Sequence, residues 1–410
     1  MNRFDLIVVG GGPSGIFTAI TAAQRGFKVA LLEKNRRIGN KILVAGSGKC
    51  NLTHTGKPKE FLDKYGANGK FLKEALNKYS PDALKSFFED NGLPLTLVEE
   101  SGKYFPYTFS SLDVLNLLKK QMLNLKVEII ENIKIQKIEK NLEEFCIQTD
   151  SETYFCENLV LSTGGKSYPG TGTTGDGYII AKELGHKIVP PRPALTPLYV
   201  KNYVFQDLSG ISFQDVEIII WKGNKKIVEK RGPILLTHTN FSGPGILDNS
   251  RYVENESYLE INYVNKEYEN LNRELIDETN TDGKKNIKKF LLKYSLPERF
   301  VKVVLKEIEI DETLKLAELS KEKRESLVRY LTSYKMEITK VGSFEMAMVT
   351  KGGIALEEIN SKTMESKKIK NLYLVGEIID IDGDTGGYNI QAACSMGVLA
   401  GKSMKRKERD

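Results

Sequence analysis

The alternation of apolar and polar positions predicts a mixed α/β chain. Short continuous apolar runs that stop at a turn are typical of buried parallel strands, and they occur at residues 5–9, 29–32, 158–162 and 371–375. Apolar residues at helical spacing predict helices over residues 71–79, 81–92, 111–123, 176–184 and 388–400. Ser110 or Ser111 is the predicted N-cap of the third of these helices.

The middle of the chain interrupts this pattern. β-Branched residues and period-two alternation predict strands over residues 126–138, 144–149 and 152–155, and again between 198 and 263. The stretch from 265 to 334 is charged and helical in pattern, and the composition shifts at the proline-rich residues 189–193 and at Gly342. Because the strand at 371–377 repeats the pattern of the first strand, we expect the C-terminal segment to complete the first domain. The predicted domains are a discontinuous first domain of residues 1–190 and 342–410, an inserted β-rich domain of residues 191–264 and a small helical domain of residues 265–341.

The turn after the first strand carries three glycines in the pattern G-x-G-x-x-G. Gly10 permits a tight turn, Gly12 lets the backbone approach a pyrophosphate, and Gly15 lets the following helix pack closely on the strand. The N-terminus of that helix offers N–H groups to the phosphates. Glu33 ends the second strand, where its carboxylate can accept hydrogen bonds from an adenosine ribose and would repel a 2′-phosphate. Strand, glycine turn, helix, strand and terminal acid together predict a dinucleotide-binding unit rather than an ordinary glycine-rich loop.

Two further glycine-rich loops follow. The first begins at Lys34 and includes residues 46–51, where small residues beside Lys and Arg suit a surface that wraps a phosphate or a flat ring. An ordinary exposed loop is the alternative. The second, residues 170–175, also matches G-x-G-x-x-G, but a loop with Pro169 separates it from the preceding strand, and no acid ends a strand about 20 residues later. We interpret it as a loop that caps the next helix, not as a second nucleotide-binding turn.

The C-terminal segment favours a flavin as the bound ring. A strand that runs into a glycine turn, an aspartate-rich stretch and a glycine-headed helix occupy residues 371–400. The N-terminus of that helix can point N–H groups at the N1/O2 edge of a flavin, where negative charge grows on reduction. Asp382 or Glu377 can bond the ribityl hydroxyls, with helix capping as the alternative for either. The turn at Thr163 and Gly164 also supports flavin over nicotinamide, which the first motif alone does not distinguish.

Composition and charge set the class of protein. A chain of 410 residues with 40% hydrophobic content can bury a large core and fits about two to three domains. The 60 Lys+Arg exceed the 54 Asp+Glu modestly, and we interpret the basic residues 402–409 as a solvated terminus rather than a nucleic-acid arm. The four cysteines form no C-x-x-C pair, which argues against a metal site or a disulfide framework. No apolar run reaches the roughly 18 residues of a membrane span and no signal peptide precedes the first strand, so we expect a cytoplasmic protein without a membrane partner.

Six blocks of the sequence carry a family resemblance. They are GGGPSGIFTAITAAQRGFKVALLEKN, KILVAGSGKCN, STGGKSYPGTGTTGDGYIIAKELGH, LTHTNFSGPGIL, VTKGGIALEEINSKTMESK and LYLVGEIIDIDGDTGGYNIQAACSMG. In colinear order they resemble a family of bacterial FAD-binding proteins that includes aminoacetone-oxidase-like proteins and the flavin reductases of bile-acid dehydroxylation. The resemblance implies an α/β fold, with a Rossmann-like, glutathione-reductase-type FAD-binding domain, an inserted β-barrel-like domain and a small helical domain.

The resemblance also implies which positions contact FAD. Residues 10–15 would contact the pyrophosphate, Glu33 the adenosine ribose, and three later segments the flavin. Lys34, Thr163 and Gly164 are added from the segments described above. The full set of expected cofactor-binding residues is Gly10, Gly12, Pro13, Ser14, Gly15, Glu33, Lys34, Lys41, Gly46, Gly48, Cys50, Asn51, Thr163, Gly164, Gly376, Glu377, Asp382, Gly387, Tyr388 and Asn389.

With FAD bound, the expected chemistry is hydride transfer at the flavin N5, in the cleft between the FAD domain and the insert. Candidate proton donors are few, because the chain has three histidines. We single out His238 as the one to test, although a structural role is the favoured alternative. Tyr168 is a second candidate, with packing before Pro169 as its alternative. Cys50 lies in a cofactor-lining loop, but it has no C-x-x-C partner, and we expect a buried structural thiol.

The second substrate separates the possible functions. We expect an FAD-dependent oxidoreductase that uses NAD(P)H as a transient co-substrate to reduce a small organic molecule, such as one with a conjugated C=C bond. The alternatives are a flavin-dependent amine oxidase and, from another class, an FAD-dependent tRNA-modifying or flavin-binding protein. The absence of a concentrated basic patch interleaved with aromatic residues argues against a nucleic-acid partner. The sequence leaves open the substrate, the choice between NADH and NADPH, and the oligomeric state.

Overall fold

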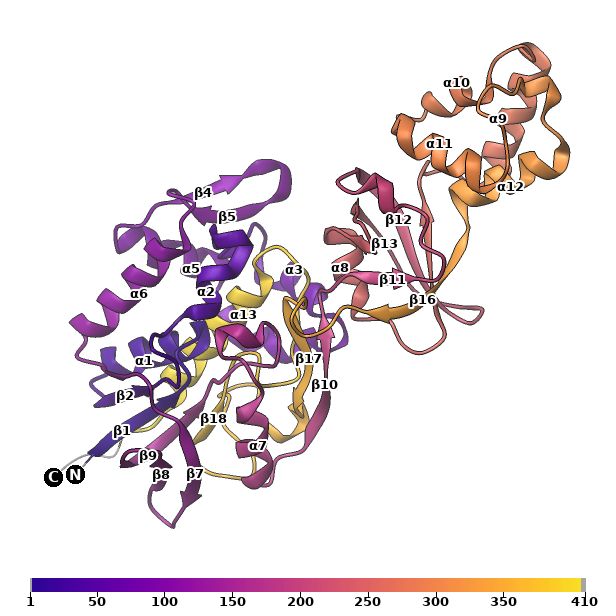
Figure 1. Cartoon of the computed structure of the whole chain (residues 1–410). Helices are drawn as coiled ribbons and strands as arrows, with labels where there is room; N and C mark the ends of the chain where they lie inside the picture. The colour runs from indigo at the N-terminus through magenta and orange to yellow at the C-terminus, as the bar shows by residue number, and fades with distance from the viewer. Residues whose placement is uncertain (1, 407–410) are drawn as a thin grey trace. The chain divides into compact units, whose positions relative to one another are not determined.

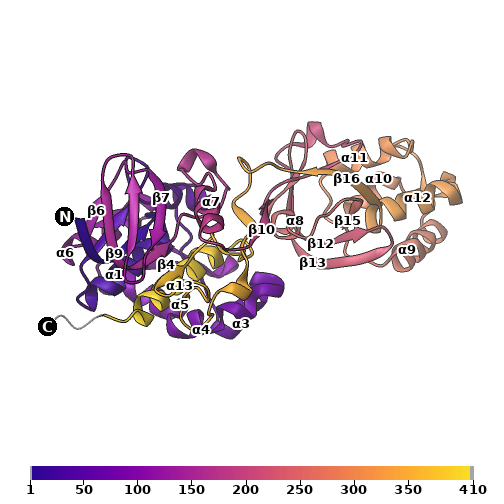
Figure 2. The ribbon, with the colours of Figure 1, turned by 90° about the horizontal axis from the view of Figure 1, so that it is seen from below.

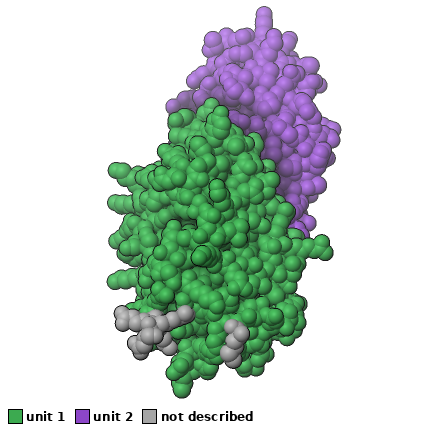
Figure 3. Space-filling view, turned by 90° about the vertical axis from the view of Figure 1, so that its left-hand side faces the viewer, with its two compact units in different colours: residues 1–193, 347–410 green, residues 194–346 purple. Residues whose placement is uncertain are grey.

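The structure is a computed structural model that describes residues 2–406. It contains two compact units (Figures 1 and 3). Unit 1 combines Met1–Pro193 with Ala347–Asp410, and unit 2 is the intervening segment Ala194–Met346. The chain therefore leaves unit 1 once, builds unit 2, and returns to finish unit 1.

Unit 1 is built on a seven-stranded sheet with a parallel centre. Strand β1 (Asn2–Val9) lies between β2 (Val29–Leu32) and β9 (Thr153–Leu161), and both of these strands run parallel to it. The sheet continues beyond β2 with β6 (Glu128–Ile130), while the late strand β18 (Leu372–Leu374) pairs in parallel with the C-terminal end of β9. The antiparallel strands β8 (Phe145–Thr149) and β7 (Ile135–Lys140) complete the other edge. The carboxyl ends of β1, β2, β9 and β18 consequently meet at one edge of the sheet.

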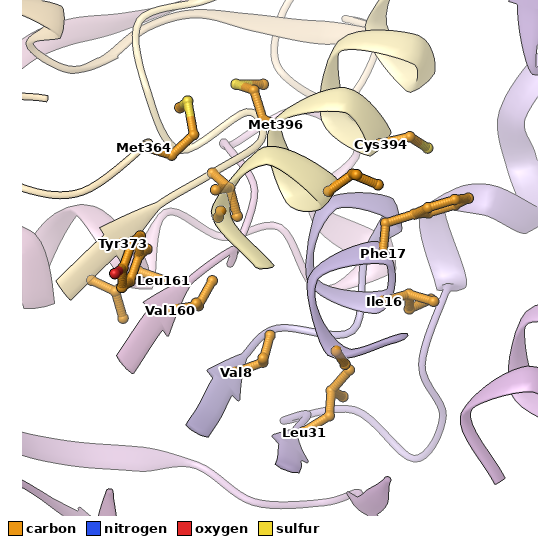
Figure 4. Close-up of a cluster of buried hydrophobic side chains, with 14 of the residues drawn as sticks. Val8, Ile16, Phe17, Leu31, Val160, Leu161, Met364, Tyr373, Cys394 and Met396 are labelled. Carbon is orange, nitrogen blue, oxygen red and sulfur yellow. The ribbon is translucent and has the colours of Figure 1, made fainter. Parts of the chain in front are cut away.

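Helices α1 (Pro13–Gln24) and α13 (Tyr388–Ser403) come from opposite ends of unit 1 and pack against each other. They pack closely, because a Cβ atom at Gly397 of α13 would stand 2.3 Å from the Ser14 carbonyl oxygen of α1. Phe17 of α1 and Cys394 and Met396 of α13 lie in the same apolar core as the strand residue Val8 (Figure 4). The C-terminal helix is thus part of the core that the N-terminal motif begins.

The remaining elements of unit 1 surround this core, with α4, α5 and α13 grouped together (Figure 2). They are α2 (Asn40–Val44), η1 (Ala45–Gly48), β3 (Thr53–His54), α3 (Pro58–Leu62), η2 (Asp63–Leu72), α4 (Lys73–Lys78), α5 (Pro81–Asp90), β4 (Leu95–Val98), η3 (Glu99–Ser101), β5 (Lys103–Pro106), α6 (Ser111–Asn124), η4 (Pro169–Thr171), α7 (Asp176–Glu183), β10 (Ile188–Ala194), β17 (Val349–Ile354) and η7 (Leu356–Glu358), where η marks a 3-10 helix.

Unit 2 contains a closed six-stranded barrel and four α-helices after its fifth strand. The barrel strands are β11 (Leu198–Val200), β12 (Ser212–Lys222), β13 (Lys225–Leu236), β14 (Phe241–Ser242), β15 (Ser257–Asn262) and β16 (Lys335–Val341). The other elements are η5 (Gln206–Leu208), α8 (Pro244–Ser250), α9 (Tyr268–Thr281), α10 (Ile287–Leu292), α11 (Glu298–Glu307), η6 (Leu316–Glu318) and α12 (Lys321–Thr332).

An aromatic cluster joins the barrel to the helices. The Phe300 ring of α11 lies 4.9 Å from the Phe213 ring of β12, 4.7 Å from Tyr263 and 5.5 Å from Phe205, measured between ring centroids. Barrel and helical residues belong to one hydrophobic cluster. The boundary expected between residues 264 and 265 falls between β15 and α9, and the two sides share this core.

The fold class expected from the sequence is confirmed, with a Rossmann-type sheet in unit 1 and an inserted barrel in unit 2. The predicted helices at 81–92, 111–123 and 388–400 appear as α5, α6 and α13, and Ser110 caps α6 by accepting a hydrogen bond from Asp113 N. The pattern did not predict the small sheet β3-β5-β4, whose strands have two to four residues and are mostly half-buried. Among residues 2–406, no helix combines the length and apolar composition needed to cross a bilayer.

We predict that Phe300→Ala destabilises unit 2 by about 3–5 kcal/mol, because it removes the ring shared by barrel and helices. Trp221, the single tryptophan of the chain, lies in β12, so its fluorescence during denaturant unfolding reports on unit 2. Ile227→Ala on the exposed part of β13 is the control and should leave the midpoint nearly unchanged. An equal midpoint for both variants would contradict the shared core.

Candidate cofactor site

The glycine turn after β1 has the geometry that a dinucleotide requires. Gly10 has φ +103°, and a Cβ atom there would lie 2.6 Å from the Ser162 carbonyl oxygen. A Cβ at Gly15 would lie 2.1 Å from the Gly10 carbonyl oxygen, so α1 and the turn touch through this glycine. At Gly12, by contrast, a Cβ would meet no atom within 4 Å. Two glycines therefore allow close packing, and the third leaves the space that a pyrophosphate would fill above the N-terminus of α1.

Glu33 has a structural role besides the expected one. Its side chain is 7% exposed, and Oε2 accepts a hydrogen bond from Gly11 N at 2.9 Å. Oε1 accepts from Asn35 N at 2.9 Å and from Asn35 Nδ2 at 2.6 Å. A carboxylate can accept about four hydrogen bonds, so room for a ribose hydroxyl remains on Oε2. Glu33 thus fixes the glycine turn and can still contact the adenosine ribose.

Lys34 is held by the loop with the second G-x-G-x-x-G motif. Its Nζ donates to Thr174 Oγ1 at 2.6 Å and pairs with Asp176 Oδ2 at 2.5 Å. Asn35 Nδ2 donates to the Thr171 carbonyl oxygen at 3.3 Å. The loop therefore lies against the residues that follow β2 and leads into α7. Since Asp176 already neutralises Lys34, any contact of Lys34 with FAD would compete with this ion pair.

Lys41 and Glu377 form a partly buried ion pair beside the late glycine turn. Lys41 Nζ lies 2.7 Å from Glu377 Oε2 and donates to Ser167 Oγ at 2.6 Å. Glu377 Oε1 accepts from Ser167 Oγ and from Thr350 N, each at 2.7 Å. The Glu377 carboxylate is therefore engaged by protein groups. Asp382, the other acid expected beside the ribityl chain, is buried as well.

Asn51 joins the loop at 46–51 to the start of α13, and Asn389 of α13 holds the segment just before that helix. With its amide placed to satisfy both groups, Asn51 accepts from Gly387 N at 3.1 Å and donates to Thr53 O at 3.0 Å. Asn389 accepts from Gly383 N at 2.8 Å and returns a hydrogen bond to Gly383 O at 2.9 Å. These side chains shape the backbone expected to face the flavin.

Cys50 and Thr163 are two further residues expected to contact the cofactor. Cys50 is fully buried, and burial raises the pKa of its thiol to about 12, so the group stays protonated at neutral pH. This favours the structural interpretation of Cys50. The Thr163 hydroxyl is buried at the carboxyl end of β9 and has no hydrogen-bond partner. The protein itself covers this hydroxyl, because it faces α7, where a Cβ atom at Gly177 would lie 1.9 Å from Thr163 Oγ1.

These observations fit FAD. The open space at Gly12 and the remaining acceptor position on Glu33 both lie at the edge where the carboxyl ends of β1 and β2 meet. The C-terminal segment reaches the same place, because a Cβ at Gly376 would stand 2.3 Å from Ser14 Oγ. The structure thereby brings together the glycine turn, Glu33 and the turn after β18. Of the expected residues, Pro13, Gly46, Gly48, Gly164 and Tyr388 belong to the segments just described.

The two proton-donor candidates lie in different units. His238 is exposed in the turn between β13 and β14 of unit 2. Tyr168 lies in unit 1 directly after Ser167, with φ +53°, and its carbonyl oxygen accepts from Thr171 N and Thr171 Oγ1, each at 2.8 Å. A non-glycine residue at positive φ is strained and persists where its surroundings hold it.

Several residues of this site were not predicted. Ser167 and Thr350 complete the Lys41 network; both lie within the blocks that carry the family resemblance, but neither was expected to contact Glu377. His54 stacks on Tyr388 with ring centroids 5.0 Å apart. Its position three residues after Asn51 was the available signal, but the stacking partner is more than 300 residues away along the chain.

Comparison with known proteins covers almost the whole chain. The family model described as HI0933-like protein Rossmann domain matches residues 4–403. A 3-dehydro-bile acid delta(4,6)-reductase of Clostridium scindens is 28% identical over 98% of this chain and 99% of its own. A ribosomal RNA dihydrouridine synthase of Haemophilus influenzae is 30% identical over 98% of each chain, and the Escherichia coli enzyme of that name is 28% identical over 98% of this chain and 100% of its own.

Solved structures share the fold at low identity. The 3-ketosteroid-delta4-(5alpha)-dehydrogenase of Rhodococcus jostii has a TM-score of 0.50 at 14% identity, over 98% of this chain and 96% of its own. The Escherichia coli quinol fumarate reductase has a TM-score of 0.51 at 14% identity, over 98% of this chain and 69% of its own.

We predict opposite consequences for two neighbouring alanine substitutions. Gly12→Ala should leave the melting temperature of the FAD-free protein unchanged and weaken FAD retention, because its methyl group enters the space for the pyrophosphate. Gly15→Ala should destabilise the fold by about 1–3 kcal/mol, because its methyl group overlaps the Gly10 carbonyl oxygen.

The measurements are thermal unfolding of the FAD-free proteins and the visible flavin absorbance that remains after dialysis. If Gly12→Ala retained FAD as the unchanged protein does, the assignment of this space to the pyrophosphate would be wrong.

Proposed function

Because the chain belongs to the HI0933-like protein Rossmann domain family, we propose that it reduces a ring carbon–carbon double bond conjugated to a carbonyl group, with NAD(P)H as the electron source. It is a flavin-dependent oxidoreductase with FAD as its cofactor. When bound, FAD supplies hydride transfer at its N5 atom. The reaction adds a hydride to one carbon of the double bond and a proton to the other, and NAD(P)H is oxidised to NAD(P)+.

The observation that carries this proposal is the chemistry shared by differently named relatives. One is a delta(4,6)-reductase of a 3-dehydro bile acid, and two are dihydrouridine synthases. A 3-dehydro steroid with a 4,6-diene and a uracil ring both present a double bond conjugated to a carbonyl, and both names describe its reduction. The relatives match at 28–30% identity over almost the whole chain, so identity alone favours neither substrate.

The residue that we propose as proton donor is Tyr168. Its phenol is 37% exposed, so a substrate could reach it. Its strained backbone is fixed by the hydrogen bonds from Thr171, and the preceding Ser167 is tied to Lys41 and Glu377. The buried thiol of Cys50 is a poor donor because its pKa is raised to about 12 and the residue is fully covered. His238 is the second candidate, from unit 2.

We predict that NADH or NADPH bleaches the flavin absorbance of the purified protein within seconds under anaerobic conditions. An α,β-unsaturated cyclic ketone added afterwards should restore the band, because it accepts the electrons. Bleaching by an amine but by neither nicotinamide would favour the amine oxidase alternative. A band that no nicotinamide changes would contradict the proposed electron source.

We predict that Tyr168→Phe lowers ketone reduction about 100-fold or more, because general acid catalysis contributes about that factor. The variant should keep its FAD and its rate of bleaching by NAD(P)H, since neither step needs the phenolic proton. His238→Ala, made in parallel, tests the other candidate. Slow turnover in His238→Ala with normal turnover in Tyr168→Phe would transfer the role to His238.

A further inference from the structure

The net positive charge of the chain is concentrated in one segment of unit 1. The whole chain has 60 Lys+Arg and 54 Asp+Glu, whereas residues 34–78 alone contain 11 Lys+Arg and 3 Asp+Glu. Residues 194–346, which form unit 2, contain 24 of each sign. An excess of eight positive charges within 45 residues is the footprint of a surface that meets a polyanion.

Most of these cations are available at the surface. Lys34 and Lys41 are neutralised by Asp176 and Glu377. Eight others are exposed and form no ion pair with any residue in the described range 2–406: Arg36, Arg37, Lys49, Lys57, Lys59, Lys70, Lys73 and Lys78. A bound dinucleotide would bring two phosphates, so FAD does not account for eight unpaired cations.

Five of these eight cations lie in the segment that follows residues 46–51, the loop expected to line the cofactor and called the cofactor loop below. Lys49 lies within the loop at 46–51, and β3 then leads into α3, η2 and α4, which contact one another. Helix α4 also packs on α13, the helix that closes the cofactor site (Figure 2). Five exposed lysines on this layer are Lys57, Lys59, Lys70, Lys73 and Lys78.

An exposed aromatic cluster adjoins the same loop. Tyr107 is 71% exposed and Phe109 41%, in the turn between β5 and α6. The Phe109 ring lies 5.6 Å from the ring of Phe105, which in turn approaches Gly46 of the cofactor loop. The turn is tied to α2 by a hydrogen bond from Ser111 Oγ to the Leu43 carbonyl oxygen. Exposed apolar residues gathered in one place mark an interaction site rather than scattered surface residues.

We propose that residues 34–78 and the Tyr107–Phe109 turn form a surface that binds unpaired RNA. Lysine and arginine side chains would neutralise backbone phosphates, and unpaired bases would stack on Tyr107 and Phe109. Two relatives are named as ribosomal RNA dihydrouridine synthases, which favours RNA over other polyanions as the ligand of this surface. The acidic pair Glu99 and Glu100 lies at the opposite end of the β4–β5 hairpin from Tyr107.

Together with the proposed function, this surface makes unpaired RNA the substrate class of the reductase, and that part of the inference rests on the proposed function. The binding of RNA to the surface does not rest on it. The sequence argued against RNA because the basic segment and the aromatic turn are separated along the chain; in the fold they come together at the loop 46–51, where Phe105 lies beside Gly46.

The first test is fluorescence anisotropy of the FAD-loaded protein with a labelled single-stranded RNA of mixed sequence. The probe should exceed the roughly 4–16 nucleotides of a typical single-strand site. Affinity should fall as salt rises, with a slope of about −0.7 for each phosphate contacted. Binding should be weaker for a duplex of the same sequence and for anionic lipid vesicles. Tighter binding to either would overturn the inference.

The second test removes four charges from the surface. The variant Lys57→Gln/Lys59→Gln/Lys70→Gln/Lys73→Gln should weaken RNA binding tenfold or more and reduce the salt slope by about 3. The matched control Lys120→Gln/Lys126→Gln/Lys134→Gln/Lys182→Gln removes four exposed lysines elsewhere in unit 1 and should change affinity about twofold or less. Equal losses in both variants would indicate general attraction to net charge and would overturn the assigned surface.

The third test addresses stacking. Tyr107→Ala should weaken binding about fivefold or more, whereas Tyr107→Phe should bind as the unchanged protein does, because it keeps the ring. All variants should keep normal bleaching by NAD(P)H and normal reduction of the small ketone. Loss of RNA binding with intact bleaching therefore tests the surface alone, while absent bleaching with intact RNA binding would defeat only the proposed function.

Discussion

The structure depends on a close approach that only glycine allows, where the two ends of unit 1 meet around Ser14. A Cβ atom at Gly397 would stand 2.3 Å from the Ser14 carbonyl oxygen, and one at Gly376 would stand 2.3 Å from Ser14 Oγ. Gly15 touches the Gly10 carbonyl oxygen in the same turn. Because glycine stands at each of these contacts, the N-terminus of α1, the turn after β18 and helix α13 can approach one another closely.

Polar contacts then fix what the close packing brings together. Glu33 holds the glycine turn through Gly11 N, and the Lys41–Glu377 pair ties the segment after β2 to the turn after β18. Breaking a partly buried pair leaves a charge with little water around it, which is why such pairs hold a geometry more than they add stability. The residues expected to contact the cofactor are therefore also held by contacts within the protein.

Local patterns in the sequence were sufficient for the buried strands, the helices at 81–92 and 111–123, and the glycine turn, because each of these is encoded within about 30 residues. Contacts over long separations were not predictable. Ser167, Thr350 and Glu377 meet only after the chain returns from unit 2, and the short strands of the β3-β5-β4 sheet carry too few buried positions to show a period. The charge excess of residues 34–78 was visible in the sequence, but its relation to Tyr107 depends on the fold.

The discontinuity of unit 1 has a consequence for how the protein is made. Strand β18 and helix α13 follow unit 2 in the chain, yet they complete the sheet and the core that β1 and α1 begin. During synthesis, the N-terminal part of unit 1 therefore has an incomplete core while some 150 residues of unit 2 emerge from the ribosome. Unit 2, which is continuous in sequence, can fold during this interval. The segments expected to contact the cofactor come together only after β18 and α13 have been translated, so we expect FAD to be captured in full only after unit 2 has been made.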